Sequence, residues 1–168
     1  MPKRISVVST EDGSGEPFDE LFRQLAGRAR IDALNEMAWE LRTSNRRRAL
    51  ALARYAIQLA DRGSRPYLSG VAFGHNTLAL CHWIEDDFRK ALPLAERAYA
   101  LFKRARDTKG IGSAATVLGL IHWKRDNAEA AWDAWQEAYD RFRQIDYESG
   151  TANSLDRKST RLNSSHTH

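Results

Sequence analysis

A segment of about forty residues repeats along this chain of 168 residues. Gly70 opens one copy, Gly110 opens the next, and Gly150 stands at the same step further on. Residues 70–109 and 110–149 share ten identical positions, where composition alone would give roughly two or three. The shared positions are Gly70/Gly110, Leu78/Leu118, Leu80/Leu120, His82/His122, Trp83/Trp123, Asp86/Asp126, Ala91/Ala131, Ala98/Ala138, Tyr99/Tyr139 and Phe102/Phe142. A period of this size is typical of arrays in which each unit packs on its neighbours, so it constrains the fold more than any single motif does.

The composition is that of a soluble globular protein, with 42% hydrophobic and 29% charged residues. No apolar run approaches the roughly eighteen residues that a membrane helix needs, so we expect no membrane partner. The basic start of the chain is followed by Glu11 and Asp12 without an apolar stretch, which argues against an export signal. The single cysteine, Cys81, cannot form an internal disulfide, and this favours a cytoplasmic location. Because it adjoins the apolar Leu80, we expect a buried thiol rather than a nucleophile.

The net charge of +4 does not indicate a nucleic-acid partner. Much of the excess comes from Arg157, Lys158 and Arg161 near the end of the chain, and the remainder is too balanced to predict a phosphate-binding face. The one dense basic cluster is Arg46–Arg48. It is either the solvated start of a helix or a basic contact for a partner, because cations are unfavourable at a helix N-terminus.

The chain divides into an N-terminal region, a helical array and a tail. Residues 1–16 are polar and without periodicity, so we predict disorder. Residues 17–30 are predicted as a short amphipathic helix that Pro17 starts and Gly27 ends, with its apolar residues at helical spacing. The array is predicted over 31–155, in units 31–66, 67–109 and 110–149 and a partial unit 150–155. Residues 156–168 are polar and unlike the array, and we expect an unstructured and non-native tail, a natural disordered tail being the alternative.

Each unit of the array reads as two amphipathic helices joined by a turn, which predicts an all-α fold. The turns are expected at Thr43–Asn45, at Glu85–Asp87 and at Asp126–Asn127. Alanines recur at i, i+4 and i+7 in the second helix of each unit, where small side chains allow close packing on the first helix. Trp135 breaks this pattern by its bulk and is expected to change the local spacing. Pro93 is expected to bend its helix near Arg89.

These units resemble tetratricopeptide repeats. The first helices carry a large apolar residue followed by a small one in Leu78–Ala79 and Leu118–Gly119, and Met37–Ala38 is a weaker version. An alanine follows thirteen residues after the small-residue motif begins, at Ala91 and Ala131, and another seven residues later at Ala98 and Ala138. The resemblance implies a right-handed α-solenoid of stacked antiparallel helical hairpins. The histidines at 82 and 122 depart from the tyrosine that is usual in the family.

In the family, the first helices line a concave groove that binds peptide or protein segments. The resemblance therefore implies a groove formed by positions on these helices. They are Asp32, Asn35, Trp39, Arg42, Phe73, Asn76, Leu80, Trp83, Ser113, Thr116, Leu120, Trp123 and Lys124. The ladder of Trp39, Trp83 and Trp123 is either a binding hot spot or packing between repeats. The groove lacks a clear set of lysines and asparagines for clamping a C-terminal carboxylate, so that ligand class is not predicted.

Chemical machinery is not evident in the sequence. His82 and His122 lack a cysteine or carboxylate at ligand spacing, so we predict no metal site. No arrangement for nucleophilic or acid–base catalysis stands out, and we expect neither a catalytic residue nor a cofactor.

Two functional hypotheses follow from the array. The first is a non-catalytic scaffold that binds a partner segment in the groove. The second is the sensory or dimerising region of a truncated bacterial signalling enzyme, because long-period repeats like that beginning at Asp32 resemble those preceding diguanylate cyclase, adenylate cyclase or histidine kinase domains. Self-association through an uncapped end of the array is a further expectation.

Overall fold

The computed structural model describes residue 22 and residues 24–145. This part of the chain is all-helical, which confirms the predicted all-α class, and it contains six helices and no strand. The helices are α2 (Gly27–Leu41), α3 (Arg46–Ala60), α4 (Leu68–Ile84), α5 (Phe88–Ala105), α6 (Thr108–Lys124) and α7 (Ala128–Gln144). The predicted disorder of residues 1–16, the partial unit 150–155 and the tail 156–168 concern residues outside the described part.

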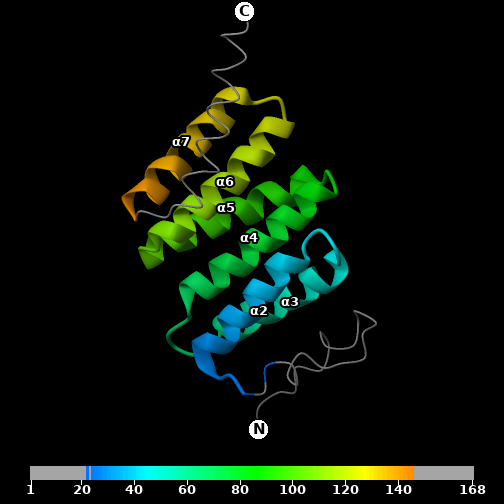
Figure 1. The fold of residues 1–168 in the computed structure, drawn as a ribbon, viewed down its shortest axis with the longest axis vertical. Coiled ribbons are helices and arrows are strands. Elements are labelled where there is room, and N and C mark those ends of the chain that lie inside the picture. Colours follow the sequence, from blue (N-terminus) through cyan, green and yellow to red (C-terminus); the bar gives the residue numbers. More distant parts are fainter. Residues whose placement is uncertain (1–21, 23, 146–168) are drawn as a thin grey trace, which may run out of the picture.

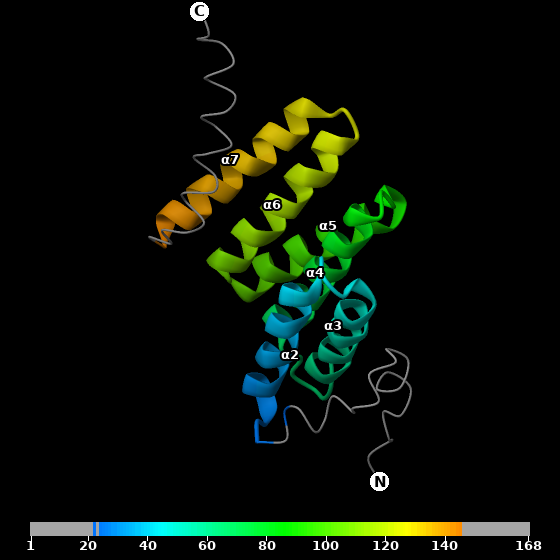
Figure 2. The ribbon, with the colours of Figure 1, turned by 45° about the vertical axis from the view of Figure 1, so that its right-hand side comes forward.

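The helices follow one another along the long axis of the molecule, from α2 and α3 at one end to α6 and α7 at the other (Figure 1). Each helix packs on the next along the chain, and the closest pairs are α2 with α3, α4 with α5, and α6 with α7. The first helices of these pairs also touch, α2 against α4 and α4 against α6. Figure 2 shows the same succession after a rotation. The contacts between first helices matter most here, because they bring distant segments of the chain onto one surface.

The turns within the last two pairs share one design. Asp86 and Asp126, forty positions apart, both adopt left-handed backbone with φ of 59° and 58°. The next residues, Asp87 and Asn127, cap the following helices by accepting a hydrogen bond from a backbone N–H three residues on. Asp107 caps α6 in the same way, through the N–H of Gly110 at 2.9 Å. The predicted turns at 85–87 and 126–127 are thereby confirmed, and so are their repeat positions.

The core follows the small residues of the second helices. The side chains of Ala49, Ala53 and Ala56 on α3 and of Ala91, Ala95 and Ala98 on α5 are fully buried. Cys81 is also fully buried, as predicted, and burial raises the pKa of its thiol to about 11. The α5 helix continues through Pro93, whose side chain is exposed.

One local expectation is wrong. Gly27 was predicted to end a helix, but α2 begins there, with φ of 59° at Gly27. A glycine with positive φ can precede or follow a helix, so the residue alone does not tell which. Residues 27–30 therefore belong to the array helix α2; of the preceding predicted helix, residues 17–21 and 23 lie outside the described part. The bulk of Trp135 is accommodated by Gly119 on α6, whose missing side chain leaves room for the indole.

Candidate functional site

A cavity of about 210 Å³ opens where the first helices meet. Its lining comes mainly from three first helices and the residues preceding them, with one residue from α5, so we call it the α2–α4–α6 cavity. The lining residues are Asp32, Asn35 and Glu36 of α2, Tyr67, Ser69 and Phe73 at and within α4, Phe102 of α5, and Asp107, Lys109, Gly110 and Ser113 at and within α6. Of the predicted groove, Asp32, Asn35, Phe73 and Ser113 meet here.

Asn35 is the buried polar centre of this cavity. Its side chain is 1% exposed, and its Nδ2 donates a hydrogen bond of 3.0 Å to the carbonyl of Gly70, thirty-five residues away. Its Oδ1 has no hydrogen-bond partner. A buried amide oxygen without a donor costs free energy, of the order of 1–3 kcal/mol. Asn35 therefore holds α2 against α4 and retains an unused acceptor beside the cavity.

Tyr67 and Asp32 form the outer edge of the cavity. The Tyr67 hydroxyl donates to Asp32 Oδ1 at 2.9 Å, and the Arg28 guanidinium lies over the Tyr67 ring at 4.6 Å. Burial, followed by the hydrogen bond to Asp32 and the charge of that carboxylate, raises the pKa of Tyr67 to about 12. The Tyr67 hydroxyl thus stays protonated, and its hydrogen bond holds Asp32 Oδ1 in place.

Trp39 and Phe73 connect the cavity with the tryptophan ladder. Their rings meet edge to face with centroids 6.1 Å apart, and the Arg42 guanidinium lies over the Trp39 ring at 4.4 Å. Arg42 also donates to the carbonyl of Trp39 at 2.6 Å. Trp39 is half-buried. Much of the Trp39 indole therefore packs between α2 and α4 and against the guanidinium of Arg42.

Trp83 repeats this arrangement one unit further on. Its Nε1–H donates to the carbonyl of Leu120 at 3.1 Å, thirty-seven residues away, so the indole joins α4 to α6. The Lys124 ammonium lies 4.7 Å from the centre of its ring and 2.7 Å from Asp86 Oδ1. Trp39 and Trp83 thus both serve contacts between neighbouring units.

Trp123 differs from the other two ladder residues. It is 58% exposed, and its ring lies 5.9 Å from that of Trp135 on α7.

The remaining predicted groove residues differ in how deeply they are buried. Asn76 and Leu80 are only 4% and 6% exposed, whereas Thr116 is half-buried and its hydroxyl donates to the carbonyl of Gly112 at 2.9 Å. These three residues do not line the cavity.

Several cavity residues escaped the sequence analysis. Tyr67 and Asp107 precede helices, Phe102 lies on a second helix, and Glu36 and Lys109 were not at positions implied by the resemblance. A signal was available for Asp107, because an Asp followed three residues later by the repeat glycine is a helix-start pattern. The cavity thus depends on residues at helix starts as much as on the inner helix faces.

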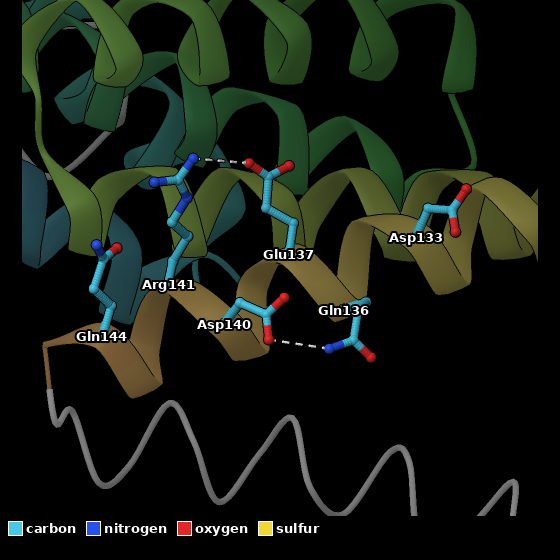
Figure 3. A pocket seen from close by; sticks show the side chains of 6 residues that line it. All are labelled: Asp133, Gln136, Glu137, Asp140, Arg141 and Gln144. Carbon is cyan, nitrogen blue, oxygen red and sulfur yellow. Dashed lines mark hydrogen bonds and ion pairs between the residues drawn. The ribbon is translucent and has the colours of Figure 1, made fainter.

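A larger hollow, of about 560 Å³, runs along α7 (Figure 3). Its described lining comes from that helix alone, and its polar groups pair with one another. Gln136 donates to Asp140 at 3.1 Å, and Arg141 lies 3.5 Å from Glu137 (Figure 3). The Tyr99 hydroxyl of α5 also donates to Glu137 at 2.7 Å. A surface built by one helix, with four of its six lining side chains paired among themselves, offers less to a ligand than a cavity bounded by several helices.

The repeated histidines face the interior of the array. His82 and His122 are half-buried, and the Nδ1 atom of each is buried without a hydrogen-bond partner. Burial lowers the pKa of His82, the main opposing influence being Glu85. Within residues 22 and 24–145, no three His, Cys, Asp or Glu side chains gather closely enough to hold a metal ion. In the same part of the chain, no helix has the length and apolar character needed to cross a membrane.

Comparison with known proteins adds nothing to the resemblance that the sequence itself shows. No protein-family model matches the sequence, and no curated protein matches it.

Proposed function

We propose that the chain is a non-catalytic scaffold that binds a segment of a partner protein along the first helices of its pairs. The proposed architecture is a right-handed solenoid of hairpins, as the resemblance to tetratricopeptide repeats implies. The observation that carries the function is the α2–α4–α6 cavity. It unites Asn35, Phe73 and Ser113, three positions that the resemblance assigns to a ligand groove, although they are about forty residues apart in sequence.

The form of this cavity supports a segment rather than a compact ligand. It is bounded by three successive first helices and flanked by half-buried aromatic side chains such as Trp39 and Phe73. Aromatic anchors beside a cavity with a few polar groups are typical of surfaces on which a peptide places one or two side chains. The predicted groove positions Arg42, Trp83, Leu120, Trp123 and Lys124 lie at or near the C-terminal ends of the same three helices.

Selection of peptides from a random displayed library tests the proposal. The selected peptides are then measured against Ser113→Arg, which places a long side chain in the cavity, and against Ala100→Arg, which adds the same charge on an exposed position of α5. We expect Ser113→Arg to abolish binding and Ala100→Arg to leave it unchanged, with circular dichroism showing that both fold. Equal binding by the Ser113→Arg protein would exclude the cavity as the binding site.

A second candidate function is the sensory or dimerising region of a bacterial signalling enzyme. The observation that favours it is the 58% exposure of Trp123 on the last pair of helices, since tryptophan is a frequent anchor residue of protein interfaces. Sedimentation at increasing concentration checks the dimerising role. A monomer at all concentrations would count against it, whereas a dimer that Trp123→Ser dissociates would support it.

A further inference from the structure

The α2–α4–α6 cavity joins three kinds of group that together select a particular side chain. It contains carboxylates, aromatic rings and an unused buried acceptor. We propose that the cavity receives the guanidinium of an arginine in the partner segment. This inference rests on the proposed function, and it specifies the chemistry of what that function leaves open.

The charge of the lining favours a cation. Asp32, Glu36 and Asp107 place three carboxylates around the cavity, against the single ammonium of Lys109. The starts of α4 and α6 also face it, and each helix N-terminus carries about half a positive charge. Asp107 already satisfies the terminus of α6 through its bond to Gly110. Once Asp107 is set against the start of α6, the two full charges of Asp32 and Glu36 exceed the Lys109 ammonium and the partial charge at the start of α4 together by about half a charge.

The unpaired acceptor of Asn35 gives independent support. This side chain is 1% exposed, and its Oδ1 lacks a donor although its Nδ2 is used. Buried polar atoms are nearly always satisfied. The Oδ1 of Asn76 is unpaired as well, but of the two only Asn35 lines the cavity, where a bound group can supply the donor. A donor there must also tolerate the carboxylates, which excludes an anionic ligand.

Aromatic rings distinguish arginine from other donors. Tyr67, Phe73 and Phe102 line the same cavity. A guanidinium is planar, stacks on aromatic rings and presents five N–H donors, so it can contact a ring, a carboxylate and an amide oxygen together. One ring already shows this preference, because the Arg28 guanidinium lies 4.6 Å from the centre of the Tyr67 ring. A cavity of about 210 Å³ has room for one such side chain.

The test is an NMR titration of the whole chain with a short blocked peptide that carries a single arginine among alanines and leucines. A matched peptide carries citrulline, which has nearly the same shape without the charge. We expect the arginine peptide to shift the side-chain amide of Asn35 and the backbone amides of Phe73 and Ser113. We also expect the citrulline peptide to bind about tenfold more weakly, as the loss of a charged hydrogen bond implies.

Two protein variants localise the effect. Glu36→Gln removes a carboxylate from the cavity, and Glu40→Gln removes the same charge one turn further along α2, outside the lining. Both residues are exposed, so neither change disturbs the core. We expect about fivefold to tenfold weaker binding of the arginine peptide for Glu36→Gln and no change for Glu40→Gln.

The outcomes separate this inference from the proposed function. Equal binding of the arginine and citrulline peptides, or equal effects of the two glutamate variants, would overturn the assignment of arginine. If peptides selected from the displayed library bind at the cavity but lack arginine, the assignment fails and the scaffold function stands. If Ser113→Arg leaves the selected peptides bound, the scaffold function itself fails at this site.

Discussion

The indole of Trp135 occupies the space that a side chain at Gly119 would fill. A Cβ at position 119 would overlap the indole nitrogen and its neighbours. The Trp135 Nε1–H also donates to the carbonyl of Thr116 at 3.3 Å, one turn before Gly119. Forty residues earlier the equivalent positions hold Ala79 and Ala95, both fully buried. A small–small pair in one unit is therefore replaced by a smallest–largest pair in the next.

This pairing predicts opposite effects of one substitution in two backgrounds. Gly119→Ala alone should lower the free energy of unfolding by about 1–3 kcal/mol, because the methyl group meets the rigid indole. With Trp135→Ala already present, the same change should raise it by up to about 1 kcal/mol, because alanine is the better helix former. Urea unfolding of the four proteins measures the coupling. Equal effects in both backgrounds would show that the two positions do not interact.

The tryptophan ladder predicts a gradient of stability effects. Trp83→Ala should cost about 2–3 kcal/mol, since it removes a half-buried ring and leaves the carbonyl of Leu120 without its donor. Trp123→Ala should cost less than about 1 kcal/mol because that ring is 58% exposed. Guanidinium unfolding followed by circular dichroism distinguishes them. A loss at Trp123 as large as that at Trp83 would mean that its exposed ring is covered in solution.

The turn aspartates predict a stabilising change to glycine. Asp126 has φ of 58°, which costs a residue with a side chain roughly 1 kcal/mol and costs glycine nothing. Asp126→Gly should therefore raise the free energy of unfolding by about 0.5 kcal/mol, part of the gain being offset by the greater freedom of glycine in the unfolded chain. Asp126→Val should lower it by more than about 1 kcal/mol. A thermal melt that ranks valine above glycine would contradict the assigned backbone conformation.

The raised acid pKa values predict instability in alkali. The pKa of the Cys81 thiol is raised from 9.0 to about 11 by burial, and those of Tyr67 and Tyr99 are raised from 10.0 to about 12. Each group loses its proton more readily when unfolded, so its contribution to stability is complete below the unfolded pKa and is lost as the pH rises through the folded one. The melting temperature should fall progressively between pH 9 and pH 12.

Replacing Cys81 separates the contribution of the thiol to this pH dependence of the melting temperature from that of the tyrosines. Cys81→Ala should remove the part of the decline that begins near pH 9 and leave the part that begins near pH 10, which belongs to the tyrosines. Comparing the shapes of the two curves avoids the fixed cost of changing a core residue. An unchanged onset in the Cys81→Ala protein would show that the thiol does not contribute.

Much of the fold could be predicted because its signals are local and repeated. Helical periodicity located the paired helices, and Asp86 and Asp126 located the turns, since a short polar side chain tolerates left-handed backbone. The start of α2 was misplaced because Gly27 gives the same signal at either end of a helix. The Gly119–Trp135 contact could not be predicted. Periodicity shows which residues share a helix face, but not which two side chains meet between helices.

The candidate site was predictable only where it follows the inner helix faces. Asn35, Phe73 and Ser113 come from the resemblance, but Tyr67 and Asp107 stand at helix starts. Their place in the cavity depends on how far each pair of helices is rotated against the next, and no single pair encodes that rotation. The hydrogen bond from Asn35 to Gly70 shows the same dependence, since it joins two units rather than neighbours within one.

The α2–α4–α6 cavity has walls on three successive pairs of helices, each of which packs on its neighbours. Any bending or stretching of the array must therefore change the distance between those walls. Tension along the molecule and occupancy of the cavity would therefore both act on the distance between these walls. If the proposed partner segment binds there, its side chain would join three pairs of helices and resist their separation.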